Sequence, residues 1–405
     1  MAAWYRDRMG FNTTSALPFY DLSAVSGSLI PYSVTDRDLF QAIEYHLLEP
    51  VTNGTWAGSE QFNAADITGA LERRRNQFLL ETGCRINHST QTGGQTPTGR
   101  VDLADTIIDV RRLVYIDANG AYTKLWPDDE YIMNAFASGW SINPGPPSVY
   151  SVIATPPVRI QIAPIPNISG TLDLLTIDAG ATLDPTTNVV MGVPDDFTWA
   201  VKFGALLDLL TKDGPPSDPI RAGYCQKRWE EGITLAKVTT SVLFAAIDGT
   251  PVHVESAFDL DTMRPGWQGA TITTPTIAAL AGLNMLILAD TPDSAPHFVT
   301  LDVLRNMPVP VNPSDIVQVG KEELDAILDY AEHLAAFKMG GAEFFATLPA
   351  YSRMVNLAMG QNARWRAFAK APGDDHNRAR RDFSQARRGA RPDAVTLSAD
   401  MEGGI

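Results

Sequence analysis

The sequence predicts an α+β protein, in which helical hairpins or a helical bundle are combined with an antiparallel β meander or small sandwich and with extended N- and C-terminal arms. Two observations predict this class. Residues 194–247 repeat apolar side chains at helical spacing on both sides of a Gly-Pro-Pro turn. Residues 101–193 instead alternate apolar and polar side chains between tight turns, which is typical of antiparallel strands.

Residues 194–247 are expected to form a central helical hairpin. Pro194-Asp195-Asp196 supplies a stop and an acidic first turn, which suits the positive end of the helix dipole. Gly214-Pro215-Pro216 ends this helix, and Asp218-Pro219 starts a second one that runs towards Phe244. The apolar stripes contain Phe197, Val201, Ala205, Leu206, Leu209 and Leu210 in the first helix, and Ile220, Tyr224, Trp229, Ile233 and Ala236 in the second.

The N-terminal third is expected to hold an arm and two short helices. Residues 1–33 are too aromatic for a typical disordered tail, so this arm is expected to dock on a neighbour or on its own domain. Within residues 34–100, Thr35 with Asp38 and Asn63 with Asp66 resemble capping boxes that start the two helices. The second helix ends at Gly83, and a mobile Thr-, Gly- and Gln-rich loop continues to Gly99.

Residues 101–193 are expected to be the antiparallel β module. An extended run containing Ile108, Val110, Val114 and Ile116 is interrupted by Arg112 and turns at residues 117–120 into the run Ala121 to Trp126. A short helix is expected from the acidic residues 128–130 to Met133. Three more runs follow at Ser148 to Ala154, Val158 to Ile162 and Thr171 to Ile177.

The C-terminal part is expected to contain a second extended segment, a helical pair and an arm. Residues 248–319 include strand candidates at Met285 to Leu288 and Val299 to Leu304. Residues 320–371 are expected to be the helical pair, broken at Gly340-Gly341 and bent or restarted near Pro349, and residues 372–405 a flexible arm. The apolar stripe of the first of these helices comprises Leu324, Ile327, Leu328, Ala331, Leu334 and Ala335.

Composition excludes several classes of protein. The net charge of −15 argues against a generic nucleic-acid binder, which relies on a basic surface. The two cysteines, Cys84 and Cys225, are too few for a disulfide framework and are expected to be free thiols in a reducing cytoplasm. The first residues lack the apolar core of a signal peptide, and no run is long enough to predict a membrane span.

The sequence predicts no enzyme: no catalytic residue, no cofactor-binding residue and no metal site. The six histidines are scattered, and no helical pair of them has the spacing of a zinc site. Residues 94–100 have the glycine spacing of a phosphate-binding loop, but Arg100 and Val101 stand where that loop needs Lys and Ser or Thr. Asp259 and Asp261 offer only two carboxylates for a cation.

Two basic clusters and one aromatic pair are the candidate contacts to partners or to other subunits. The run at Arg73 is either a solvated face or a source of intersubunit salt bridges. The C-terminal arginines either lock into an adjacent subunit or belong to a solvated tail. The candidate residues are Trp4, Tyr5, Arg73, Arg74, Arg75, Arg378, Arg380, Arg381, Arg387 and Arg388.

The order of helical hairpin, β meander and second hairpin resembles the adaptor (neck or connector) proteins of tailed bacteriophages. The resemblance rests on Val101 to Val110, on Pro164-Ile165-Pro166 with Gly170, and on Pro194 to Lys237, which includes the Pro-Asp-Asp-Phe and Asp-Pro-Ile-Arg-Ala-x-Tyr helix starts. It extends over about half of the chain and leaves out the second extended segment and the C-terminal helical pair.

This resemblance implies a structural virion protein at the head–tail junction, assembled in the cytoplasm of a host bacterium. Such adaptors form homo-oligomeric rings, often of twelve copies, that join the portal protein to tail or nozzle proteins and let double-stranded DNA pass. An acidic bore would let DNA slide, since phosphate affinity needs cations. The alternatives are another tail, collar or nozzle protein, or a soluble hydrolase or carbohydrate-binding protein with a β module.

Overall fold

The α+β prediction is confirmed. In this computed structural model the chain divides into two compact units, one containing described residues 321–336 and 343–370 and the other containing the rest. The structure describes residues 4–13, 18–24, 31–47, 62–92, 99–136, 139–140, 142–153, 157–167, 170–212, 217–238, 242–272, 275–289, 291–292, 296–306 and 321–370.

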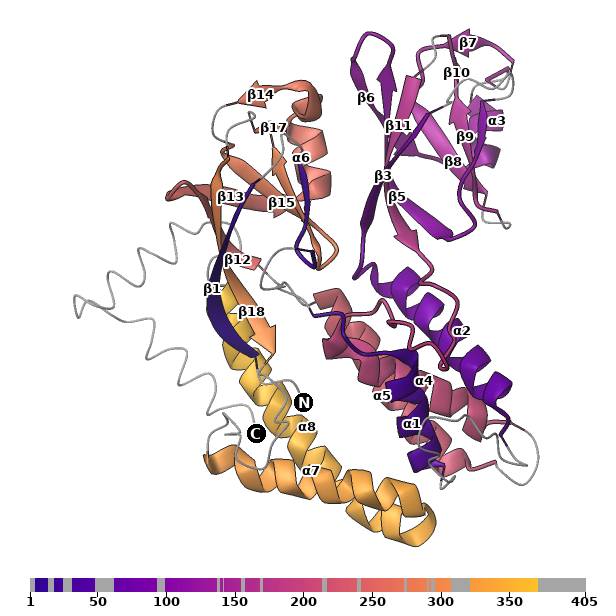
Figure 1. Ribbon diagram of the computed structural model, residues 1–405, viewed down its shortest axis with the longest axis vertical. Coiled ribbons are helices and arrows are strands. Elements are labelled where there is room, and N and C mark those ends of the chain that lie inside the picture. Colours follow the sequence, from indigo (N-terminus) through magenta and orange to yellow (C-terminus); the bar gives the residue numbers. More distant parts are fainter. Residues whose placement is uncertain are drawn as a thin grey trace, which may run out of the picture. The chain divides into compact units, whose positions relative to one another are not determined.

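Four helices of the larger unit pack together, and we call them the helical module (Figure 1). Their starts follow the predicted caps: the Asp38 amide donates to Thr35 Oγ1 at 3.3 Å and the Asp66 amide to Asn63 Oδ1 at 2.7 Å. Gly83, at φ 58°, ends the second helix as predicted. The helices are α1 (Asp36–His46), α2 (Ala64–Thr82), α4 (Thr198–Leu210) and α5 (Pro219–Val238).

The central hairpin forms, with two corrections to the prediction. A short 3₁₀ turn (Asp195–Phe197) precedes α4, and the whole predicted stripe of the first helix is buried. In α5, Trp229 packs against Phe78 of α2 at 5.8 Å between ring centroids, but Ile220 is 52% exposed instead of buried. The helix also ends at Val238, and Val242–Ile247 form a strand because these β-branched, aromatic and aliphatic residues pair with two neighbouring strands.

Seven strands form the sheet of the first β module, in the order β3-β11-β5-β6-β8-β9-β4. At the predicted turn, Asp117 Oδ1 accepts hydrogen bonds from the amides of Asn119 and Ala121, both at 2.8 Å. The sheet encloses an apolar core that includes Leu113, Tyr150 and Leu172. The strands are β3 (Asn87–Thr92), β4 (Arg100–Asp102), β5 (Ile107–Asp117), β6 (Tyr122–Pro127), β8 (Val149–Ile153), β9 (Arg159–Ala163) and β11 (Gly170–Asp178).

Two features of this module differ from the prediction. The expected mobile loop from Gly83 to Gly99 contains β3, a polar strand without apolar alternation that pairs with β11 at the sheet edge. The pairing is also not wholly antiparallel, because β6 and β8 run parallel. The chain between them contains α3 (Glu130–Phe136) and β7 (Pro144–Gly145), which itself pairs in parallel with β10 (Ile165–Pro166).

A second seven-stranded sheet, in the order β1-β18-β12-β13-β15-β16-β2, belongs to the second β module. Its edges come from the expected N-terminal arm, whose residues 4–12 and 19–21 are strands of this chain's own sheet. Asp248-Gly249 makes a two-residue hairpin with positive φ at both positions, of 49° and 80°. The strands are β1 (Trp4–Asn12), β2 (Phe19–Asp21), β12 (Val242–Ile247), β13 (Thr250–Ser256), β15 (Ile277–Ala281), β16 (Met285–Ala289) and β18 (Phe298–Asn306).

The smaller elements of the second β module lie around its parallel pair, β13 and β15. Helix α6 (Ala257–Met263) and a 3₁₀ turn, η2 (Trp267–Gly269), lie in the connection between these two strands. Two short strands, β14 (Thr271–Ile272) and β17 (Thr291–Pro292), pair with each other in parallel.

A buried polar network joins the two β modules. Arg112, which interrupts the apolar run of β5, donates from Nε and Nη2 to Asp261 at 2.7 and 2.8 Å. Lys124 Nζ lies 3.0 Å from the same carboxylate, and Trp267 Nε1 donates to it at 2.9 Å. The cations that meet Asp261 are therefore side chains of the first β module.

Most of the C-terminal helical pair belongs to the smaller unit. It consists of α7 (Lys321–Met339) and α8 (Gly341–Lys370), and α8 runs without a break through Pro349. The break between the helices falls at Gly340-Gly341 as predicted, with φ of 66° and 56° at these two residues. His333 of α7 is buried, stacked against Phe344 and Tyr351 of α8.

The predicted stripe on α7 is not a buried face. Leu324 and Leu328 are 42% and 58% exposed, and Ala331 and Ala335 are exposed too. The apolar residues do recur at helical spacing, but within the described part of the chain only Ile327 and Leu334 of this stripe are partly buried. These residues therefore do not form a core within the described part of the chain.

Candidate functional site

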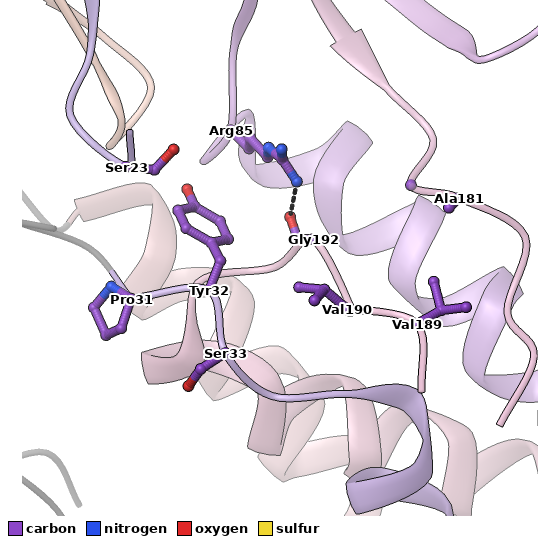
Figure 2. A pocket seen from close by; sticks show the side chains of 10 residues that line it. Ser23, Pro31, Tyr32, Ser33, Arg85, Ala181, Val189, Val190 and Gly192 are labelled. Atoms are coloured by element: carbon purple, nitrogen blue, oxygen red, sulfur yellow. Dashed lines mark hydrogen bonds between the residues drawn. The ribbon is translucent and has the colours of Figure 1, made fainter. Parts of the chain in front are cut away.

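A cavity of about 650 Å³ lies where several connecting segments of the larger unit meet (Figure 2). They are the turn after β2, the segment that leads into α1, the link between α2 and β3, and the link between β11 and α4. The lining residues are Ser23, Pro31, Tyr32, Ser33, Arg85, Gly180, Ala181, Val189, Val190 and Gly192.

Carboxylates fix two of these segments. Asp195 accepts hydrogen bonds from the Ser33 amide at 2.8 Å, the Ser33 hydroxyl at 2.5 Å and the Val34 amide at 2.9 Å. Asp36 Oδ1 accepts from the Val189 amide at 3.0 Å, and the Asp36 amide donates to the Val189 carbonyl. These two walls of the cavity are therefore main-chain segments that carboxylates hold in place through charge-assisted hydrogen bonds.

Arg85 is the cation of the cavity. Its Nη1 donates to the Gly192 carbonyl at 3.2 Å, and its guanidinium carbon lies 5.1 Å from the centroid of the Tyr32 ring (Figure 2). Gly192 has φ +69°, and a Cβ there would lie 2.8 Å from Arg85 Nη1. Glycine at this position is therefore what lets the arginine lie against the wall.

Tyr32 turns its hydroxyl into the protein, towards Ser23 (Figure 2). Burial raises the pKa of this phenol, and its oxygen has no hydrogen-bond partner among the described residues. A buried hydroxyl without a partner costs about 1–3 kcal/mol. The ring itself serves as the stacking surface for Arg85.

Tyr32→Phe is expected to stabilise the protein, because it removes the buried hydroxyl and keeps the ring under Arg85. The free energy of unfolding should rise by about 1 kcal/mol. Urea denaturation of the full chain followed by tryptophan fluorescence measures this. A loss of stability of similar size would show that the hydroxyl has an acceptor in solution.

The cysteines are not arranged as nucleophiles. Both are free and buried, and burial raises the pKa of the Cys84 thiol to about 11 and also raises that of Cys225. The reactive form of cysteine is the thiolate, which these surroundings disfavour. Within the described residues, no three His, Cys, Asp or Glu side chains come together to hold a metal ion.

The Arg73 run is divided between the surface and the interior. Arg73 is exposed and lies 3.3 Å from Asp208, whereas Arg74 binds the same carboxylate and stacks over Trp229 at 5.2 Å. Arg75 is completely buried, donating to the carbonyls of Ala181 and Gly180 at 2.7 and 3.2 Å. In this conformation Arg75 supports the cavity wall and is out of a partner's reach.

The other candidate contacts are placed only in part. Trp4 and Tyr5 begin β1, with backbone register opposite Asn306 and Arg305 of β18. The C-terminal candidates lie outside the described residues: Arg378, Arg380, Arg381, Arg387 and Arg388. Their role as partner contacts stays a prediction.

A second electrostatic feature surrounds His46 at the end of α1. The imidazole is buried, its Nε2 lies 3.4 Å from Lys202 Nζ, and the Phe337 ring packs edge-on at 5.4 Å. Burial, followed by the charges of Lys202, Lys338 and Arg221, lowers the pKa of His46 to about 3. Burial also lowers the pKa of Lys202, to about 8.

Acid is therefore expected to destabilise the helical module through His46. Between pH 6.5 and about 3 the unfolded chain binds a proton at this imidazole that the folded chain does not, so stability falls as pH falls through this window. At pH 5 the loss amounts to about 2 kcal/mol. In urea denaturation at pH 7 and pH 5, His46→Gln should remove most of this difference. Retention of the full difference would contradict the assignment, and the half-exposed His253→Gln controls for loss of an imidazole.

Comparison with known proteins identifies no family. No family model matches the chain, and no curated protein matches it. Among solved structures, the chain is similar to one described as "Neck of empty GTA particle computed with C6 symmetry", with 17% sequence identity and a TM-score of 0.18. The match covers 52% of this chain and 94% of the other. Of the helices that the structure describes, none has the length and apolar character needed to cross a bilayer.

Proposed function

We propose that this chain is a structural virion protein, an adaptor that forms a ring between the portal and the tail of a phage-like particle. One observation carries the proposal: the segments that resemble adaptor proteins form strands of one β module and a helical hairpin, the elements that the resemblance implies. Residues 101–110 supply β4 and the start of β5, residues 164–170 supply β10 and the start of β11, and residues 194–237 supply the α4–α5 hairpin packed on α2.

Exposed apolar side chains support a role in assembly. Large exposed apolar areas mark interaction surfaces in proteins. In the larger unit Tyr131 and Ile142 are 81% and 78% exposed, and in the smaller unit Leu328 and Phe345 are 58% and 63% exposed. A ring of identical subunits would cover such surfaces by heterologous contacts.

In this proposal twelve copies of the chain form the ring. The ring contacts a portal protein on one side and tail or nozzle proteins on the other. The net charge of −15 supports passage of double-stranded DNA through the ring without tight binding. The proposal has no catalytic step and no cofactor.

Immunogold electron microscopy tests the proposal on intact particles with an antibody against this chain. Label is expected at the capsid vertex where head and tail join. Label along the tail or its fibres would instead favour a different structural protein of the tail. Absence from particles, together with turnover of a substrate by the purified chain, would favour the hydrolase alternative.

Deletion of residues 371–405 is expected to weaken ring assembly more than it lowers the melting temperature. The physical reason is the basic cluster in this segment, which suits contacts to an acidic neighbouring subunit. Mass photometry of ring formation and differential scanning calorimetry measure the two effects. Equal losses of assembly and melting temperature would show that the segment belongs to the fold.

A further inference from the structure

The cavity at Arg85 has a positive charge without a matching carboxylate from the described part of the chain. The bonds of this guanidinium are the one to the Gly192 carbonyl and the stacking contact with Tyr32. Arg85 forms no ion pair with a carboxylate of the described segments. A guanidinium suits a carboxylate ligand because its nitrogen atoms form two parallel hydrogen bonds with one.

The carboxylates that bind the lining segments already have donors. Asp195 binds Ser33 and Val34, and Asp36 binds the Val189 amide. Asp21 accepts from the Ser23 hydroxyl at 2.7 Å and from Asn284 Nδ2 at 3.2 Å. These carboxylates build the walls, which leaves the cation available to a ligand in a chain of net charge −15.

One wall also offers main-chain groups. Val189 accepts from the Asp36 amide and Met191 donates to the Val34 carbonyl, so both face the segment before α1. The N–H and C=O of the intervening Val190 point to the opposite side in an extended segment, and no described residue bonds to them. The Val190 side chain is 45% exposed.

We propose that this cavity binds an extended peptide segment of a partner protein through one acidic side chain. The carboxylate pairs with Arg85, and the peptide main chain adds along Val190 in the manner of an extra strand. The apolar walls at Pro31, Val189 and Val190 take the flanking side chains. This inference goes beyond the virion role and does not depend on it.

The wall chemistry favours a peptide over a phosphate ligand. A phosphate site usually collects several cations or a series of amide donors, and here the lining contains one guanidinium. The hydroxyls of the lining serines, Ser23 and Ser33, already donate to Asp21 and Asp195. A pocket with mainly apolar walls and one charged group instead fits a hydrophobic segment with one acidic residue.

Methyl NMR on the full-length protein, labelled at its valine methyl groups, provides the test. The probe is a pool of acetylated, amidated pentapeptides with Asp at the centre and mixed residues elsewhere. Saturable shifts of the Val189 and Val190 methyl signals are expected. A matched pool with Asn at the centre should bind at least 10-fold more weakly, and sodium acetate should bind at least 10-fold more weakly as well.

Two variants locate the binding. Arg85→Met keeps the aliphatic stem and should weaken binding of the Asp pool at least 10-fold. Val190→Asp keeps Arg85 but adds a negative charge at an exposed position, which repels the acidic ligand. This variant should also weaken binding of the Asp pool at least 10-fold. Arg159→Met removes an arginine outside the cavity and should leave binding unchanged. The proposal is overturned if the Asp and Asn pools bind equally, if acetate binds as well as the Asp pool, or if no Val189 or Val190 signal moves.

Discussion

Asp261→Asn is expected to lower the free energy of unfolding by about 3 kcal/mol or more. Loss of one partner from a buried ion pair leaves the other charge uncompensated, at a cost of about 3–5 kcal/mol. Here the side chains of Arg112 and Asp261 are 7% and 4% exposed, and Lys124 meets the same carboxylate. The substitution therefore leaves two cations at the junction of the β modules. Urea denaturation of the full chain measures the loss.

Acid should reproduce part of this effect. Burial alone would raise the pKa of Asp261, but the hydrogen bond and charge of Arg112, helped by Trp267 and Lys124, outweigh burial and lower it. A depressed carboxyl pKa contributes stability at neutral pH that is lost as pH falls below the ordinary range of aspartate. Asp261→Asn should therefore weaken the pH dependence of stability in that acidic range.

A surface ion pair provides the matched control for Asp261→Asn. Asp102 and Arg159 lie 2.9 Å apart with side chains 63% and 42% exposed. Exposed pairs contribute less than about 1 kcal/mol, so Asp102→Asn should have little effect. Equal losses for Asp102→Asn and Asp261→Asn would contradict the buried network.

Gly232→Ala is expected to destabilise the helical hairpin by about 2 kcal/mol, although alanine is the better helix former. A Cβ at Gly232 would lie 2.2 Å from Ala200 Cβ, so α4 and α5 would have to move apart. Overpacking of this kind costs about 1–3 kcal/mol. Circular dichroism during thermal and urea unfolding measures the change.

The same helix contains the control for this prediction. A Cβ at Gly223 would meet nothing within 4 Å, so Gly223→Ala should stabilise α5 by about 0.5–1 kcal/mol. Ala200→Gly combined with Gly232→Ala should recover most of the loss, because it removes the colliding methyl group. Stabilisation by Gly232→Ala alone would show that the helices are not in contact there.

Local features of this chain could be predicted from sequence, and distant pairings could not. The Thr35 cap and the turn at Asp117 depend on residues within four positions of each other, so their patterns are visible in the sequence. Arg112 and Asp261 are 149 residues apart, and the sequence around each of them does not indicate which residue it pairs with. The cavity likewise arises from segments that contain no motif.

One prediction was wrong, and one correct pattern did not show whether its face is buried. The Asp248-Gly249 hairpin had a strong sequence signal, and the prediction of continued helix towards Phe244 overlooked it. The α7 stripe was recognised, but periodicity shows only which residues share a face. Whether that face is covered depends on a surface that the sequence of α7 does not contain.

The pairing of β1 with β18 constrains how the protein can be made on the ribosome. Arg8 and Asp302, joined by a 2.8 Å ion pair, are 294 residues apart. Strand β1 must therefore wait while almost 300 further residues are synthesised before its partner strand emerges. Contacts between such distant residues form slowly because a long loop must close first. The second β module therefore completes its sheet only after the first β module and the helical module have all their residues.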